Sequence, residues 1–127
     1  GTSSPCTSTA KDKLRYYNYN IPLPANTTVK GIQVRLDAKA DSTSSSPKLC
    51  VQLSWDGGTT WTSAKSTTSL TTAEKTYLLG STVDIWGHAW TVSQLGNTAF
   101  RVRVIDVATS ISRDFSLDFV AVQVIYQ

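Results

Sequence analysis

Methionine is absent from the 127 residues, and histidine and glutamate each occur once, as His88 and Glu74. Because a chain without Met lacks its own initiator, we expect a processed product or an excised piece of a longer protein. A lone imidazole can serve one catalytic triad at most, and the sequence has no Gly-x-Ser-x-Gly elbow to supply its nucleophile. These scarcities disfavour nucleophilic catalysis.

Paired carboxylates and metal-ligand runs are also scarce. Glycoside hydrolysis needs two converging carboxylates, but the acids are dispersed along the chain. Glu74 falls in a polar loop, and Asp118 interrupts an apolar strand, where burial would make it an anchor for a turn or a backbone group. No Asp-x-Asp-x-Asp run is present, so no metal site is assigned, although one structural Ca²⁺ stays open as an alternative. We therefore predict a non-enzyme with no catalytic residue and no cofactor.

Long apolar runs and basic clusters are missing as well. No stretch approaches the roughly 18 apolar residues of a membrane helix, so we expect no membrane span. The net charge is +3, from 12 Lys and Arg against 9 Asp and Glu, and the basic residues are scattered singly. This distribution gives no support for a nucleic acid partner.

Hydroxyl side chains dominate what is present, with 18 Thr and 16 Ser. Thr favours exposed strand faces and Ser favours loops, so this composition is typical of an all-β protein. Apolar and polar residues alternate in seven segments, the pattern of half-buried strands: residues 14–20, 29–38, 50–55, 59–65, 76–79, 100–106 and 117–126. These segments predict an antiparallel β-sandwich, jelly-roll-like, with about seven to nine strands.

The two ends of the chain differ in pattern. Residues 1–13 have no periodicity and are predicted to form an N-terminal arm, whereas residues 14–127 form the sandwich domain. The last segment carries apolar residues on both faces, Val120 on one and Phe119 and Ile125 on the other. We expect this strand to be covered on both sides and to pair with an early strand.

The stretch 51–62 predicts a hairpin around which the rest is organised, with Asp56-Gly57-Gly58 as its turn and residues 59–65 as its return strand. Five positions in and around this turn have a motif spacing: Ser54, Asp56, Gly58, Thr60 and Trp61. They resemble the Asp-box of bacterial sialidases and many other secreted β proteins. The resemblance implies that the Asp carboxylate accepts backbone N–H bonds and that the Trp packs over the turn. A sialidase would need a propeller with repeated boxes, and this chain has one.

A wider pattern covers roughly residues 14 to 126. Its segments follow one another in a fixed order: 21–22, 29–34, 51–58, 84–87, 100–104 and 117–120. This order resembles a β-sandwich module that is repeated in large secreted and surface proteins of bacteria and in phage tail proteins. The resemblance implies an extracellular location, secreted or on the cell surface, and brings no established activity with it.

Cys6 and Cys50 are the only cysteines, and a hydroxyl-rich β domain favours a disulfide between them. The bridge would close a loop of 50 − 6 = 44 residues, worth roughly 4 kcal/mol by loop entropy. In the alternative, Cys50 is a small buried hydrophobe. Asn26-Thr27-Thr28 is a sequon, so Asn26 is a candidate for N-glycosylation.

The aromatic residues give an ambiguous functional signal. Sugar rings stack on exposed Tyr and Trp, and five residues are candidates for such a platform: Tyr16, Tyr17, Tyr19, Trp86 and Trp90. In the structural alternative, which we favour for the tryptophans, Trp55 and Trp61 stabilise the hairpin, and Trp86 and Trp90 plug the edge of the sandwich.

Two hypotheses about function follow. The first is a non-catalytic structural or adhesive module, a self-assembling subunit or tandem repeat of a surface appendage. Its partners would be copies of itself, joined through the N-terminal arm at residues 1–12 and through sheet edges. The second is a carbohydrate-binding module of a secreted protein, with a polysaccharide as partner. Pairing of the arm with another copy would favour the first. Folding back on its own domain, with an exposed coplanar aromatic pair remaining, would favour the second.

Overall fold

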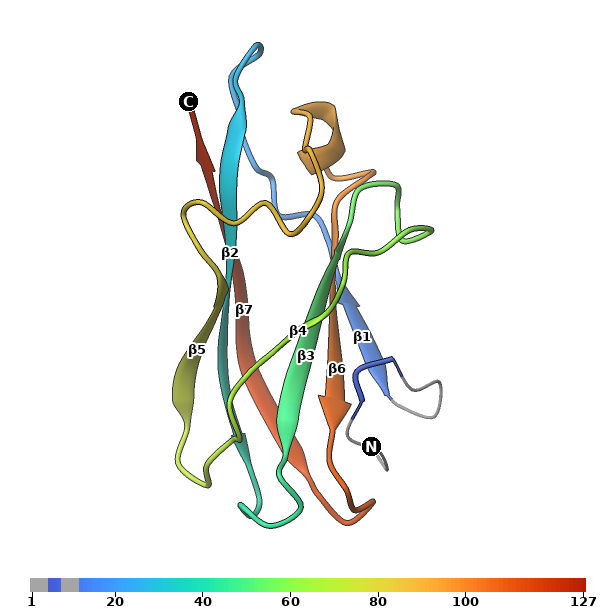
Figure 1. The fold of residues 1–127 in the computed structure, drawn as a ribbon, viewed down its shortest axis with the longest axis vertical. Coiled ribbons are helices and arrows are strands. Elements are labelled where there is room, and N and C mark those ends of the chain that lie inside the picture. The colour runs from blue at the N-terminus through green and yellow to red at the C-terminus, as the bar shows by residue number, and fades with distance from the viewer. Residues whose placement is uncertain (1–4, 8–11) are drawn as a thin grey trace.

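The computed structural model describes residues 5–7 and 12–127. They form seven strands and one short 3₁₀ helix (Figure 1): β1 Lys13–Tyr16, β2 Val29–Ala40, β3 Lys48–Ser54, β4 Lys65–Ser66, β5 Lys75–Gly80, η1 Ser93–Leu95, β6 Arg101–Val107 and β7 Phe115–Tyr126. The strands make two antiparallel sheets, ordered β1-β6-β3-β4 and β5-β2-β7. The predicted all-β sandwich is therefore confirmed.

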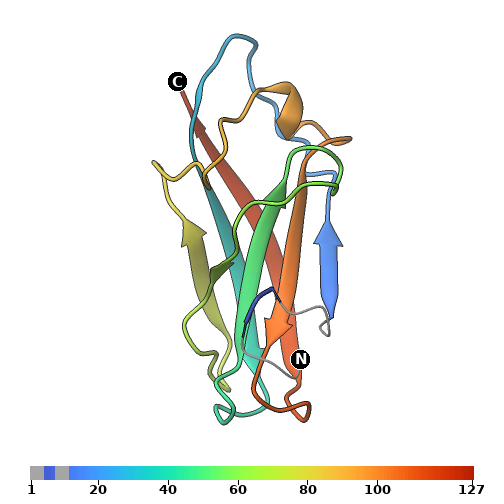
Figure 2. The same ribbon diagram turned by 45° about the vertical axis from the view of Figure 1, so that its right-hand side comes forward.

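The strands of each sheet come from distant parts of the chain. The last strand, β7, pairs with β2 from Val29 opposite Tyr126 to Ala40 opposite Phe115, which confirms the predicted long-range pairing. Both ribbon views show β7 beside β2 along its length (Figures 1 and 2). In the other sheet, β6 lies between β1 and β3, so residues near position 15 meet residues near position 103.

The core lies between the sheets and follows the alternation of the strands. Ile32, Val34 and Leu36 of β2 are fully buried, as their spacing predicts. They pack with inward residues of the opposite sheet, among them Leu53 and Val102. Burying a side chain of this size contributes about 1.5–3 kcal/mol.

The jelly-roll form of the prediction is not reproduced. The residues that the structure describes make sheets of four and three strands, whereas a jelly roll has eight strands in a double sheet. The arm boundary is also shifted, because Lys13 is the first residue of β1 and pairs with Ile105.

The predicted return strand at residues 59–65 is wrong. After β3 the chain forms an irregular loop, and only Lys65 and Ser66 pair with β3, as β4. The physical reason is local: the side chains of Ser54 and Asp56 hold three successive backbone N–H groups and curl the chain. The loop returns to β3 at one point, where the backbone N–H of Thr62 donates to the carbonyl of Leu53 at 2.9 Å.

The expectation that β7 is covered on both faces is also wrong. Phe119 on its outer face is 48 % exposed, and the inward valines of β7 are only partly buried. β7 is an edge strand, since β2 is its only partner among the described strands. Runs of apolar residues on both faces had suggested a central strand.

Two glycines allow the loop after β5 to cross β2. A Cβ on Gly31 would collide with the backbone of Thr82, and one on Gly80 would collide with the carbonyl of Ile32 and the indole of Trp86. Gly80 also has φ +79°, a conformation that strains other residues. The close approach lets the Trp86 indole donate to the Ile32 carbonyl at 2.8 Å.

Candidate functional site

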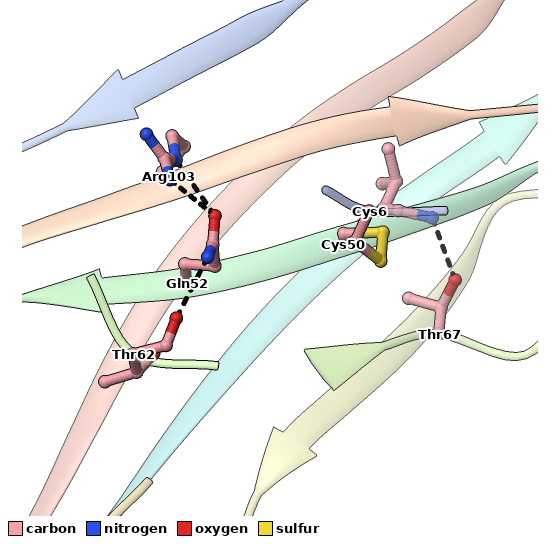
Figure 3. The surroundings of a disulfide bond; sticks show 7 residues. Cys6, Cys50, Gln52, Thr62, Thr67 and Arg103 are labelled. Carbon is pink, nitrogen blue, oxygen red and sulfur yellow. Dashed lines mark hydrogen bonds between the residues drawn. A yellow bond between two sulfur atoms is a disulfide. The ribbon is translucent and has the colours of Figure 1, made fainter. Parts of the chain in front are cut away.

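The predicted disulfide is present: Cys6 and Cys50 are bonded, with their Cα atoms 5.8 Å apart. Cys50 is fully buried on the outer face of the four-stranded sheet, beside Ile105 and Val107 of β6. The bond holds the described part of the N-terminal segment, residues 5–7, against its own domain (Figure 3). Residues 1–4 and 8–11, which make up most of the predicted arm, lie outside the described residues.

The loop after β3 is held by a carboxylate inside it. The Asp56 carboxylate accepts the backbone N–H groups of Thr59 at 3.0 Å and Thr60 at 2.8 Å, and the Ser54 hydroxyl at 2.9 Å. Hydrogen bonds, those from Thr60 first, lower the pKa of Asp56 to about 2. The Ser54 hydroxyl oxygen in turn accepts the N–H of Gly58. The Asp56 carboxylate is therefore hydrogen-bonded by groups of its own loop.

Trp61 ends the loop over the sheet. Its indole N–H donates to the Gly58 carbonyl at 3.0 Å, which fixes the ring at the surface. The guanidinium of Arg103 lies 3.9 Å from the ring centroid, and that of Arg15 lies 5.4 Å from it. Arg15 also lies beside Gly58, where a Cβ would stand 3.1 Å from its Nη1. The loop thus brings an aromatic ring to two arginines from distant strands.

Two of the five predicted stacking residues have no free ring face. Trp86 and Trp90 are 5 % and 7 % exposed, so they belong to the core, as the structural alternative held. Trp86 has φ +57°, a conformation rare for a bulky residue. It is held by Asp84, whose carboxylate accepts its backbone N–H. The Trp90 indole donates to the Ile85 carbonyl at 2.9 Å. These rings close one end of the sandwich and cannot stack on a sugar.

The three predicted tyrosines are divided. Tyr16 and Tyr19 are partly buried and pack on the core. Burial raises the pKa of both hydroxyls, and the charge interaction with Tyr16 raises the pKa of Tyr19 further. Tyr17 is 58 % exposed, and the Arg101 guanidinium lies 5.0 Å from its ring centroid. Of the three, Tyr17 alone presents most of its ring to solvent.

His88 has a structural environment. Its ring stacks on Trp55 with centroids 3.8 Å apart, and it meets Trp90 edge to face at 4.9 Å. Its Nε2 lies 3.0 Å from the side-chain oxygen of Gln94, just within η1. These contacts occupy the imidazole with an aromatic cluster and an amide.

One pair of carboxylates does meet, at the surface. Asp118 is exposed rather than buried, since it is the extra residue where the register of β7 shifts. A hydrogen bond and charge repulsion from Asp118 raise the pKa of Glu74. Among the residues that the structure describes, no group of three His, Cys, Asp or Glu side chains could hold a metal ion. Asn26, the candidate glycosylation site, is exposed in the loop before β2.

The outer face of the four-stranded sheet is basic. Arg15 of β1 lies directly opposite Arg103 of β6. Arg101 lies two residues before Arg103 in β6 and is on the same face. Outward positions of β1, β3 and β6 carry five basic residues and no acid: Lys13, Arg15, Lys48, Arg101 and Arg103. The sequence indicated that Arg101 and Arg103 point outward, but the site predicted from it included none of the three arginines. Arg15 is 88 positions from Arg103 along the chain, so their proximity could not be read from the sequence.

The edge strand of the three-stranded sheet, β7, is apolar over most of its length. The last eight residues of β7, from Phe119 to Tyr126, contain no charged residue, no Pro and no Gly. At the other end of β7, an open cleft of about 610 Å³ lies between β1 and the start of β7, with Val104, Asp106 and Leu117 in its lining. Arg113 also lines this cleft, and its Nη1 lies 3.6 Å from Asp41.

Comparison with known proteins adds no relative. No family model, no curated protein and no solved structure matches the chain. No helix in the described part of the chain is long and apolar enough to cross a membrane.

Proposed function

We propose that the chain is a non-catalytic structural and adhesive module of a secreted or surface protein, and that its copies join edge to edge through β7. The observation that carries this proposal is the free edge of β7, a strand of twelve residues whose last eight are uncharged. An exposed, long and apolar edge strand is a template for pairing with another chain.

The other edges of the sandwich carry protection that the last eight residues of β7 lack. β1 has four residues and includes Lys13 and Arg15, and β4 has two residues. β5 has six residues, starts with Lys75 and ends at a glycine with positive φ. Short length and basic residues are the usual means by which proteins prevent edge pairing. The lack of both in β7 supports a partner at this edge.

The phase of the ladder tells which backbone groups of β7 face outward. Thr28 and Gln127 exchange both backbone hydrogen bonds, each at 2.9 Å. Such pairs alternate with pairs whose N–H and C=O groups point away. Counting along β7 through its register shift, the groups of Val120, Val122 and Val124 point to the open edge. These groups could bind a second strand without breaking any bond to β2.

A second copy of β7 fits this edge by symmetry. If the strands pair antiparallel about Val122, Val120 faces Val124 of the partner subunit, and each such pair exchanges two backbone bonds. Phe119 then lies opposite the partner's Ile125 on the outer face, which covers a ring that is 48 % exposed. The two three-stranded sheets would become one sheet of six.

This edge contact takes the place of the arm as the main assembly route. The Cys6–Cys50 bond ties the described part of the arm to its own sheet, which does not favour an arm that reaches a neighbour. The polysaccharide alternative concerns the other face of the molecule.

The test is the mass of the protein in solution, measured by light scattering or sedimentation across a wide range of concentration. The parent protein is expected to form a dimer. Phe119→Lys should give a monomer, because the two-fold contact would bury its charge. Val122→Pro should do the same, since it removes an outward N–H and leaves the bonds to β2.

Leu78→Lys is the matched control. Leu78 is 56 % exposed on the outer face of the same sheet, at the opposite edge. It should leave the dimer intact, and circular dichroism should show that every variant is folded. A parent protein that stays monomeric at all concentrations would end the proposal, as would equal effects of Phe119→Lys and Leu78→Lys.

A further inference from the structure

In the part of the chain that the structure describes, the outward strand positions of the basic face hold no acid that would neutralise its charge. Arg15 and Arg103 lie opposite each other on neighbouring strands, roughly 5 Å apart across the sheet. Like charges in that position repel. Within the described residues, ion pairs are made by other basic residues, namely Arg35, Lys65 and Arg113. Burial, and then the charge of Arg15, lower the pKa of Arg103.

Neutral acceptors hold these arginines in place. The side-chain oxygen of Gln52 accepts from Arg103 Nε at 3.1 Å and Nη2 at 2.6 Å. The Gln52 amide in turn donates to the Thr62 carbonyl at 2.9 Å, as Figure 3 shows. Arg101 donates from Nη1 to the carbonyls of Asn97 and Phe100, both at 2.8 Å. These bonds order the guanidinium groups while their positive charge stays available.

Flat rings lie among the arginines. Trp61 is held by its bond to Gly58 beside Arg103 and Arg15, and Tyr17 lies under Arg101. Guanidinium groups recognise carboxylate and sulfate geometry, and aromatic rings pack against the apolar faces of sugars. One surface therefore holds guanidinium groups and aromatic rings side by side, with Tyr17 58 % exposed.

We propose that the face formed by Arg15, Tyr17, Trp61, Arg101 and Arg103 binds an acidic polysaccharide, a chain of sugars that bear carboxylate or sulfate groups. Charge complementarity identifies the ligand as an anion, and the ordered rings identify it as one with flat apolar faces. The face is an open strand surface and suits a long chain. This binding does not depend on the β7 contact, which lies on the other sheet.

A polysaccharide fits better than a nucleic acid for two reasons. The chain has a net charge of only +3, and nucleic acid affinity comes mainly from many phosphate contacts. A disulfide on the same face is typical of an oxidising, extracellular setting, where acidic glycans are the abundant polyanions.

The test is binding of polygalacturonate, a polymer of carboxylated sugars, measured by calorimetry and affinity electrophoresis. Its methyl-esterified form serves as the uncharged match, and a sulfated glycan tests the other anionic group. The parent protein should bind polygalacturonate and the sulfated glycan, and it should bind the ester at least about tenfold more weakly. Added salt should weaken binding, since exposed charges are screened. Arg15→Gln should weaken binding by at least about tenfold, because Arg15 is exposed and makes no hydrogen bond within the described residues.

Arg35→Gln provides the matched control for charge. Arg35 is an exposed arginine beside an aromatic ring, Phe119, on the opposite sheet, but it is paired with Asp37. Its loss should leave binding within about twofold of the parent. Equal losses in Arg15→Gln and Arg35→Gln would show an effect of bulk charge and overturn the proposal. Equal binding of the ester would do the same, as would tighter binding of single-stranded DNA through the same arginines, or no binding of either acidic polymer.

Discussion

The outer faces of the two sheets use arginine in opposite ways. On the three-stranded sheet, Arg35 lies 5.3 Å from the ring of Phe119 and makes two hydrogen bonds to Asp37, at 3.0 and 2.9 Å. On the four-stranded sheet, Arg103 lies 3.9 Å from the ring of Trp61 and bonds to the neutral Gln52. Both side chains are ordered by an acceptor and a ring. The carboxylate cancels the charge, whereas the amide leaves it at the surface.

The faces also differ in how they treat apolar groups. Phe119 and Leu78 are about half exposed on the three-stranded face. On the four-stranded face, Cys50, Ile105 and Val107 are instead buried, and Cys6, which is bonded to Cys50, packs against them. This difference underlies the two proposals, which assign a protein contact to one sheet and an acidic polysaccharide to the other.

The largest expected effect comes from removing the disulfide, which is confined to the four-stranded face. Cys6→Ala with Cys50→Ala should lower the free energy of unfolding by roughly 4 kcal/mol, because the bond closes a loop of 44 residues. Urea denaturation measures the loss. Hydrogen exchange should rise first in β3 and β6 rather than in β2. A loss below about 1 kcal/mol would show that the loop-closure argument does not apply here.

Exchanging the acceptor of Arg103 tests the comparison directly. Gln52→Glu would give Arg103 a carboxylate, as Asp37 gives one to Arg35, and so cancel its charge. Binding of polygalacturonate should weaken by at least about tenfold while the fold is kept. Gln52→Leu, which removes the amide and leaves Arg103 charged, is the control and should cost less. If both variants bind as the parent does, Arg103 takes no part in binding.

Asp56 should matter because it orders the loop that carries Trp61. Asp56→Ala strips the acceptor from Thr59 and Thr60 and should lower the melting temperature, whereas Asp56→Asn keeps one acceptor and should lower it less. Trp61 should become more mobile in the Ala variant, which fluorescence anisotropy would report. A melting temperature unchanged by Asp56→Ala would show that the hydrogen bonds to Asp56 do not stabilise the protein.

The same carboxylate gives stability a pH dependence. Its pKa falls from the ordinary 3.8 to about 2 in the folded protein. A lowered folded pKa stabilises the protein above the unfolded value, and this stabilisation is lost as the pH falls from about 4 towards 2. Glu74 acts in the opposite sense, since its raised pKa reduces stability once it ionises. The free energy of unfolding, measured by denaturation at several pH values, should therefore change less between about pH 2 and 4 in Asp56→Asn than in the parent protein.

The smallest effect is expected at His88, which lies on neither face. His88→Gln removes one stacking contact with Trp55 and should change stability by about 1 kcal/mol or less. Assembly and polygalacturonate binding should stay as in the parent. If His88→Gln abolished any activity of the protein in a variant that still folds, the proposal of a non-catalytic module would be wrong.

Local pattern in the sequence was sufficient for most strands and for the disulfide. Alternation placed Ile32, Val34 and Leu36 in the core, and the single pair of cysteines left one intramolecular bond to form. The return strand failed, because side-chain bonds from Ser54 and Asp56 took the backbone groups that a hairpin would have paired. Periodicity does not register such local competition.

The sequence by itself determined an all-β chain with one disulfide, because strand formation follows from residues that are neighbours along the chain. Only the tertiary structure decided that β7 is an edge strand and that Arg15 meets Arg103 and Trp61. Strand order and register depend on how distant segments bury their apolar faces together. The open edge and the basic face are products of that packing.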